Sequence, residues 1–292
     1  MNALFLAAAY VFAPVVVPGA SFMVNFSGPN DQGQVVVNPD IGSGIYQDGT
    51  FTPLPPPPAG YYVTGLGINN AGTVTGVAFT TPDFLEQGFI LKGSNYSFFS
   101  RPGWQNTEAR AIGNSGLVTG WSIDYDTGQS AGFVYDPRTG TFTDATPPGS
   151  DYTIVQGINK AGVISGNGHD ANGSYAFIWQ QGTFAKGKGT VPFIDTFLVN
   201  NERGRARGIN DAGVIVGFTE SAGFVGNAVR GYQLLTVPGA TTTGAGTTFC
   251  AGINNSGQVT CGFIDFDAGT FRAFIGTPRN GDDDDQGKHD SP

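Results

Sequence analysis

Acidic side chains in two loops of this chain are spaced so that they could bind a metal ion. The loops are residues 124–128 (DYDTG) and 265–269 (DFDAG), with a weaker copy at 170–173 (DANG). Ca²⁺ takes about six to eight oxygen ligands, which oxygen side chains at alternate positions can supply. The same residue types also form ordinary tight turns, and the distant glutamate of an EF-hand loop is absent. The pattern favours turns, and the alternative is calcium bound by Asp124, Asp126, Asp265 and Asp267.

The two cysteines, Cys250 and Cys261, could form a disulfide across one hairpin. A four-residue turn at 254–257 (NNSG) would place residue 253 opposite 258 and Cys250 opposite Cys261. Cβ atoms of opposed residues lie about 4.5 to 5.5 Å apart, so modest adjustment would allow the bond. An even cysteine count fits an exported protein. The alternative is two small apolar side chains packed in the core.

Residues for conventional catalysis are scarce. The chain has two histidines, and because His289 lies in an acidic tail, a Ser-His-Asp or Cys-His site would depend on His169. Nucleophile-elbow, phosphate-loop and His-Glu-x-x-His motifs are absent. Carboxylates from different parts of the fold could still converge, as glycoside hydrolysis requires. The candidates, each also explicable as a solvated surface acid, are Glu86, Glu108, Asp195 and Glu202.

An internal repeat determines the elements that must position these residues. A Gly-Ile-Asn-x-Ala/Ser-Gly phrase occurs six times, most degraded in the first copy, 28–33 (GPNDQG). Its closing glycines, at intervals of 39, 44, 46, 51 and 44 residues, are Gly33, Gly72, Gly116, Gly162, Gly213 and Gly257. These intervals are typical of four-stranded propeller blades. Because Asn and Gly tolerate positive φ, we expect the phrase to form a tight hairpin turn.

The residues around each turn alternate with the period of two that strands require, as in 174–179 (SYAFIW). Each copy predicts one strand ending in Gly-Ile-Asn and a second after the turn. A third has an aromatic core, such as 132–135 (GFVY), and a fourth resembles 141–143 (TFT). Proline and glycine then end the pairing. The predicted fold is all-β, a six-bladed β-propeller of four-stranded blades.

The last blade needs a strand from the opposite end of the sequence. Its third strand, 271–275 (FRAFI), is followed by the acidic stretch 280–292. Segment 15–20 (VVVPGA) matches 235–240 (LTVPGA), which follows the fourth strand of copy five. We expect residues about 10–17 to complete the last blade, so that no sheet edge stays open. Residues 1–279 are then one domain, and 280–292 are a disordered tail.

Charge argues against a nucleic-acid partner, since the net charge is −9 and only 14 residues are Lys or Arg. The one basic cluster, Arg203, Arg205 and Arg207, lies beside Glu202 and is interpreted as a solvated loop. Residues 1–12 (MNALFLAAAYVF) are apolar but lack a preceding cation and are too short to span a bilayer. We interpret them as a structural strand, or as a sequence whose true start is lost, with no clear signal peptide and no membrane span.

The repeats resemble the HAF repeats of predicted bacterial extracellular proteins. The resemblance rests on 17–20 (VPGA), on the Gly-Ile-Asn-x-Ala-Gly turns and on strands such as 176–179 (AFIW), and it covers about residues 12 to 276. The eponymous His-Ala-Phe is not intact, because Tyr175 and Arg272 occupy the histidine position. The resemblance implies an extracellular or cell-surface location and no established reaction.

Three classes of function remain. A secreted or cell-surface module that binds a glycan or protein without catalysis is favoured, because the strands repeat while the loops vary. A structural surface component would need no pocket. A glycan-active enzyme would need carboxylates from several blades. We expect a monomer with no cofactor apart from the calcium alternative, and a function carried by positions that differ between copies.

Overall fold

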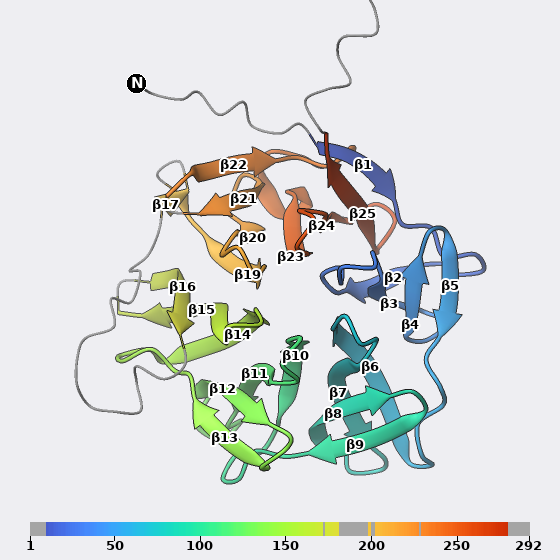
Figure 1. Ribbon diagram of the computed structural model, residues 1–292, viewed down its shortest axis with the longest axis vertical. Helices are drawn as coiled ribbons and strands as arrows, with labels where there is room; N and C mark the ends of the chain where they lie inside the picture. The colour runs from blue at the N-terminus through green and yellow to red at the C-terminus, as the bar shows by residue number, and fades with distance from the viewer. Residues whose placement is uncertain (1–9, 172, 181–197, 200–201, 228, 280–292) are drawn as a thin grey trace, which may run out of the picture.

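The computed structural model describes residues 10–171, 173–180, 198–199, 202–227 and 229–279. Six of its antiparallel sheets are arranged radially around one axis as blades (Figure 1), which confirms the predicted six-bladed propeller. Five sheets have four strands, and the sheet of blade 4 has three within the described residues. No helix among the described residues is long and apolar enough to cross a membrane.

The strands follow the predicted order within each blade. Blade 1 contains β2 (Met23–Phe26), β3 (Val35–Pro39), β4 (Gly44–Gln47) and β5 (Thr50–Pro53), and blade 2 contains β6 (Tyr61–Ile68), β7 (Val74–Thr80), β8 (Glu86–Lys92) and β9 (Asn95–Phe99). Blade 3 contains β10 (Glu108–Ile112), β11 (Val118–Ile123), β12 (Ser130–Asp136) and β13 (Thr141–Asp144), and blade 4 contains β14 (Tyr152–Ile158), β15 (Val163–Asp170) and β16 (Gly173–Gln180). Blade 5 contains β19 (Arg205–Ile209), β20 (Ile215–Phe218), β21 (Gly223–Asn227) and β22 (Gly231–Leu235), and blade 6 contains β23 (Phe249–Ile253), β24 (Val259–Asp265), β25 (Thr270–Pro278) and β1 (Tyr10–Pro14). A short pair, β17 (Leu198–Val199) with β18 (Glu202–Arg203), precedes blade 5, and the 3-10 turn η2 (Gly244–Gly246) precedes blade 6.

The strand β1 closes the ring, as predicted. It pairs antiparallel with β25 from Tyr10 opposite Pro278 to Pro14 opposite Phe274, and the two strands lie side by side in Figure 1. The strand ends at Pro14, earlier than the expected residue 17, although the N–H of Val15 still donates to the carbonyl of Ala273 over 2.8 Å. The outer edge of β25 is therefore covered without a second molecule.

The Gly-Ile-Asn-x-Ala/Ser-Gly phrase joins neighbouring blades as well as turning the chain. Its first glycine is required for close packing, because a Cβ on Gly252 would lie 2.3 Å from the Cα of Gly28 in blade 1. Its isoleucine is buried, with exposures of 7 to 8% in blades 2 to 6. The residues of the phrase therefore make contacts between blades, in addition to those within their own hairpin.

The asparagine of the phrase does not have the positive φ that we expected, and only the closing glycine does, as at Gly72 with φ 70°. Asn69 instead accepts hydrogen bonds through Oδ1 from the N–H groups of Ala71 at 3.1 Å and Thr73 at 3.0 Å. Its side chain replaces main-chain partners inside the turn, which is the ordinary role of Asn in such turns. The expectation of positive φ was wrong for the asparagine and right for the closing glycine, and the hairpin itself was predicted correctly.

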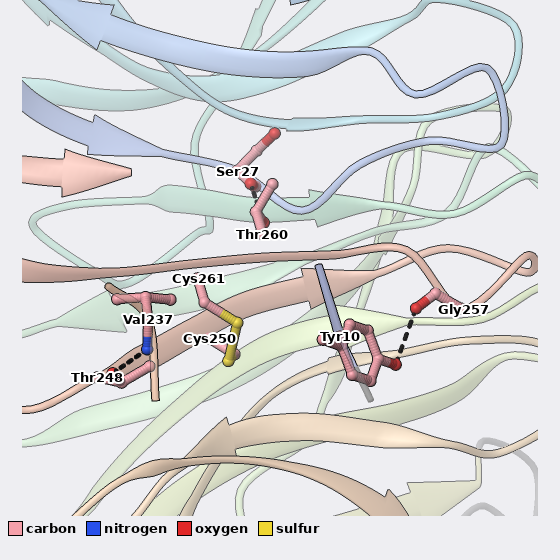
Figure 2. The surroundings of a disulfide bond; sticks show 8 residues. All are labelled: Tyr10, Ser27, Val237, Thr248, Cys250, Gly257, Thr260 and Cys261. Atoms are coloured by element: carbon pink, nitrogen blue, oxygen red, sulfur yellow. Dashed lines mark hydrogen bonds between the residues drawn. A yellow bond between two sulfur atoms is a disulfide. The ribbon is translucent and has the colours of Figure 1, made fainter. Parts of the chain in front are cut away.

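The cysteines lie between the first two strands of blade 6 (Figure 2). The Sγ atoms of Cys250 and Cys261 are 2.04 Å apart, and both side chains are fully buried. The register differs from the expected one, because Ile253 lies opposite Val259 rather than residue 258. A one-residue bulge at residue 251 compensates, so that Cys250 still lies opposite Cys261.

Candidate functional site

A cavity of about 130 Å³ lies on the axis of the ring and is lined by residues from all six blades. The Gly-Ile-Asn turns end the inner strands and hydrogen-bond to one another around one mouth of this channel, which we call the turn face. The inner strands begin at the other end, which we call the opposite face. Loops between the second and third strands of each blade also lie at the opposite face, because antiparallel strands alternate in direction.

Bulges in the inner strands determine which side chains line the channel. In blades 2 to 6 the pairing register shifts by one residue just before the Gly-Ile pair or its Ala111-Ile112 equivalent. A bulge leaves one residue unpaired and re-aims its side chain. The extra residues, all lining the cavity, are Leu66, Arg110, Gln156, Arg207 and Ala251. The bulge residue is therefore polar in three consecutive blades, 3 to 5, and apolar in the other two, blades 2 and 6.

Arg207 is the most desolvated cation of this arc. Its guanidinium carbon lies 5.4 Å from the ring centroid of Phe218 and 5.6 Å from that of Phe249. Burial lowers the pKa of Arg207 to about 10, and the positive charges of Arg110 and Arg205 contribute to this lowering. Among the described residues, no carboxylate forms an ion pair with Arg207 or Arg205. The folded protein thus holds a cation with aromatic neighbours but no anion.

Glu108 and Arg110 form the blade 3 part of the site. The Nε of Arg110 lies 2.7 Å from Oε1 of Glu108, and the indole N–H of Trp121 donates to Oε2 over 3.1 Å. Burial raises the pKa of Glu108, and the charge of Glu86 raises it as well, while Arg110 and Trp121 act to lower it. The charge of Arg110 therefore has a partner, in contrast to that of Arg207.

Tyr152 of blade 4 lies between these two groups. Its ring centroid is 5.9 Å from that of Trp121, and burial raises the pKa of its hydroxyl, which also senses the charges of Arg110, Arg205, Glu108 and Arg207. We call Arg110, Arg205 and Arg207 the arginine cluster. Blades 3, 4 and 5 hence bring two cations, Arg110 and Arg207, to the channel, with the exposed Arg205, one carboxyl group and two aromatic rings nearby.

Further polar groups continue the site outwards towards the rim of blades 2 and 3. Asn106 is buried and donates through Nδ2 to Oε2 of Glu86 over 2.5 Å, while its Oδ1 accepts from the N–H of Ile123 over 2.7 Å. Tyr125 lies on the adjoining loop with 60% of its surface exposed, and its hydroxyl is 3.4 Å from Nδ2 of Asn106. The exposed aromatic ring and the buried amide give this rim both an apolar surface and fixed donors and acceptors.

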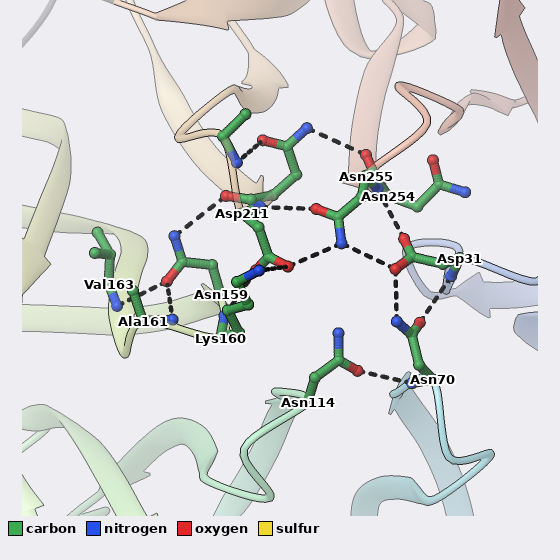
Figure 3. A network of polar contacts seen from close by, with 12 residues as sticks. Asp31, Asn70, Asn114, Asn159, Lys160, Ala161, Val163, Asp211, Asn254 and Asn255 are labelled. Carbon is green, nitrogen blue, oxygen red and sulfur yellow. Dashed lines mark hydrogen bonds and ion pairs between the residues drawn. The ribbon is translucent and has the colours of Figure 1, made fainter.

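The turn face carries a different network (Figure 3), in which asparagine amides connect successive blades. Each Nδ2 donates to the turn carbonyl of the next blade over 2.9 to 3.3 Å, and the donors are Asn30, Asn69, Asn159, Asn210 and Asn254. In a second set, the N–H of the next residue donates to a side-chain oxygen of the next blade, as from Asn255 to Asp31 over 2.8 Å. These bonds make the turn face a structural ring.

Both sets of bonds are interrupted at the same place, between blades 3 and 4. Gly113 stands where the other blades have asparagine, so blade 3 has no amide to donate. Lys160 stands where the other blades have Asp or Asn, so it offers no side-chain acceptor to the N–H of Asn114. Blades 3 and 4 are therefore joined at this face without the two bonds found at the other five junctions.

The four aspartates considered for calcium are not brought together. Asp124 and Asp126 lie on the β11–β12 loop of blade 3, whereas Asp265 and Asp267 belong to the β24–β25 hairpin of blade 6. Asp124 accepts from the N–H of Asp126 over 2.9 Å, and Asp265 accepts from Arg272 over 2.9 Å. No cluster of three or more His, Cys, Asp or Glu suited to a metal occurs in the described part of the chain. Calcium binding by these loops stays a prediction.

The other predicted residues have separate positions. Glu86 and Glu108 lie on neighbouring blades, and burial, together with the charge of Glu86, raises the pKa of Glu108. His169 is exposed and lies 2.8 Å from Asp151 through Nδ1. Asp195 and His289 lie outside the described residues, and Glu202 belongs to β18. The interpretation of the basic cluster as a solvated loop was wrong for Arg207, which lies on the inner strand β19 and lines the channel. Arg205 lies on the same strand, not on a loop, and is exposed as expected.

Comparison with family models and with curated proteins gives no match. Among solved structures, the chain is similar to the extracellular domain of BT4673 from B. thetaiotaomicron, described in one structure as a one-component system and in another as a hybrid two-component system. The TM-scores are 0.49 and 0.48, each at 11% identity over 90% and 91% of this chain. The chain spans 39% of the length of each of those proteins. We take no functional conclusion from this likeness.

Proposed function

We propose that this protein is a secreted or cell-surface module that binds a ligand without transforming it. The observation that carries the proposal is the asymmetric site of blades 3 to 5, where the arginine cluster meets Trp121 and Tyr152. Strands that repeat their backbone contacts hold residues that do not repeat, which is the usual relation between a rigid fold and a binding site. Because the inner strands contact one another through their backbones, these groups are positioned before any ligand arrives.

Two features support an exported module. The disulfide between Cys250 and Cys261 is of the kind that persists in oxidising compartments. The resemblance to HAF repeats implies the same location. A glycan is the favoured ligand, since exposed aromatic rings beside fixed amide and carboxyl groups can contact both the C–H face and the hydroxyls of a sugar.

Two matching loops provide the experiment. Tyr125 of blade 3 and Phe266 of blade 6 occupy the same position between two aspartates, and they are 60% and 64% exposed. Only Tyr125 adjoins Glu86 and Asn106. On a glycan array, we expect hits with the wild type that Tyr125→Ala weakens and Phe266→Ala leaves unchanged. An array with no hits, or equal losses from both variants, would refute the proposal.

Glycan hydrolysis is a second candidate function, favoured by the electrostatic influence of Glu86 on Glu108. Burial raises the pKa of Glu108, and a carboxyl group with a raised pKa can act as the proton donor in glycoside hydrolysis. Release of reducing ends from array-positive glycans by the wild type, abolished in Glu108→Gln, would make the protein an enzyme. Unchanged glycan after prolonged incubation would favour the binding module.

A further inference from the structure

We infer that the ligand presents a carboxylate to the arginine cluster, and that it is an acidic glycan of the uronate type. This inference rests on the proposed binding function and specifies the chemistry of its ligand. It concerns Arg207 above all, the cation that blade 5 contributes to the arc formed by blades 3 to 5.

The charges around Arg207 leave it without compensation. Arg110 is engaged by Glu108 at 2.7 Å, and Glu108 is engaged in turn by Trp121 at 3.1 Å. Arg207, which lines the channel, and Arg205, which is exposed, have no carboxylate partner among the described residues, and the charge of Arg205 adds to the positive surroundings of Arg207. Holding an unpaired charge in a partly desolvated channel destabilises the folded protein. An anion supplied by a ligand would remove that cost.

The geometry favours a planar anion with one charge. Phe218 lies near both Arg205, at 5.7 Å, and Arg207, at 5.4 Å, so the ring holds the two guanidinium groups in place. A guanidinium presents its N–H donors as a fork that matches a carboxylate with two parallel hydrogen bonds. Two such forks with no competing carboxylate form a site for a carboxylate, in a chain whose net charge of −9 otherwise repels anions.

The neighbouring aromatic rings favour a sugar as the carrier of that carboxylate. Trp121 and Tyr152 are adjacent, with ring planes inclined at 58°, and Tyr125 extends the aromatic surface to the rim. A uronate sugar has a carboxylate on an otherwise uncharged ring, so one group can enter the arginine cluster while the C–H face packs on an aromatic side chain. The further sugar residues of the oligosaccharide would then extend towards Tyr125 and make uncharged contacts with it.

Calorimetric titration of the purified full chain tests the inference. The probes are oligogalacturonate and oligoglucuronate, each compared with its neutral galactose or glucose oligomer at equal ionic strength. We expect the uronates to bind at least about 10-fold more tightly than the neutral oligomers, and Arg207→Gln to weaken uronate binding about 10- to 100-fold, because charged hydrogen bonds are lost. Arg207→Lys should fall between them, since it keeps the charge and loses the fork.

Arg138→Gln is the matched control, because Arg138 is exposed and pairs with Asp136 of its own loop. It should change uronate binding less than about twofold. Thermal unfolding of the ligand-free variants supplies an independent readout, in which Arg207→Gln should melt above the wild type once the desolvated charge is gone. This also shows that the variant is folded.

The outcomes separate the inference from the proposed function. Equal binding of neutral and acidic oligomers, or uronate binding that Arg207→Gln leaves unchanged, overturns the inference while the binding function stands. Absence of uronate binding also overturns it, and array hits lost in Tyr125→Ala would still support the function. Without array hits, the function and the inference both fail.

Discussion

Repairing the junction between blades 3 and 4 should stabilise the whole ring. The change is Gly113→Asn combined with Lys160→Asn, which restores the residue types found at the other junctions. The backbone at Gly113 is already suitable, since its N–H donates to Leu117 and its carbonyl accepts from Gly116, as Asn69 does with Thr73 and Gly72. A Cβ at position 113 would lie 3.3 Å from Cγ2 of Ile158, which a small shift of that methyl group accommodates.

The magnitude follows from the bonds gained. The amide introduced at position 113 would donate to the carbonyl of residue 159 and accept inside its own turn, while the amide introduced at position 160 would accept from the N–H of Asn114. At about 1 kcal/mol for each net hydrogen bond, with about 0.5 kcal/mol from replacing a glycine, the double change should add about 3 kcal/mol. The lost contact between Lys160 and Asp211 is 3.8 Å long and exposed on the lysine side, so it subtracts little.

Thermal unfolding followed by circular dichroism measures the effect. For a chain of this size the gain corresponds to a rise in Tm of about 5 °C. Asn210→Gly is the reverse change at an intact junction, since it removes the donation to the carbonyl of Asn254 at 3.2 Å and the acceptor of its turn. It should lower Tm by a similar amount. A repaired variant that melts no higher than the wild type, while Asn210→Gly destabilises, would refute the account of the junction.

Three further predictions concern other joints of the ring. Replacing both Cys250 and Cys261 by Ser should lower the free energy of unfolding by about 3 kcal/mol, the loop-entropy value for their separation of 11 residues. Urea titration measures this loss of stability, and an unchanged unfolding midpoint would contradict the prediction. Deleting residues 1–14 should produce oligomers or aggregates on size-exclusion chromatography, because the edge of β25 becomes exposed. A synthetic peptide with the sequence of β1 should restore the monomer. A deletion variant that stays monomeric would count against the closure of the ring by β1. Burial raises the pKa of Asp31, but hydrogen bonds from Asn255 and Asn70 and the charge of Lys160 outweigh this effect and lower the pKa. The ionised Asp31 therefore stabilises the fold above the unfolded-state pKa of about 3.9, and this stability is lost as pH falls through the lower pKa of the folded state. Asp31→Asn should flatten the acid side of a curve of stability against pH, and an unchanged acid side would exclude Asp31 as its source.

The fold could be predicted because its strongest constraints act on the backbone. Gly252 and Gly28 approach too closely for any side chain, so such glycines recur in the repeats and reveal the spacing of the blades. The closing strand could also be predicted, since the segment after β1 matches the linker that follows β22. What the sequence did not reveal was the role of the asparagine amides between blades, because one hairpin considered alone has no neighbour to receive them.

The candidate site was harder to predict for a geometric reason. Arg110 and Arg207 face the channel only because a bulge inserts one residue before the Gly-Ile pair or its equivalent, and strict alternation does not anticipate it. A comparison of that position between copies would have found both arginines together with Gln156. The influence of Glu86 on Glu108 acts between adjacent blades, so neither residue stood out from other surface acids.

The antiparallel pairing of β1 with β25, here called the clasp, affects how the ring responds to mechanical force. Tyr10 lies beside Pro278, so the chain enters and leaves blade 6 at the same end of the same strand pair. Tension that pulls these two points apart would load the hydrogen bonds of the clasp one after another, as in a zipper, instead of loading all of them together in shear. The ring would then open at a small force while the other five blades, each made from a continuous stretch of chain, carried almost none of it.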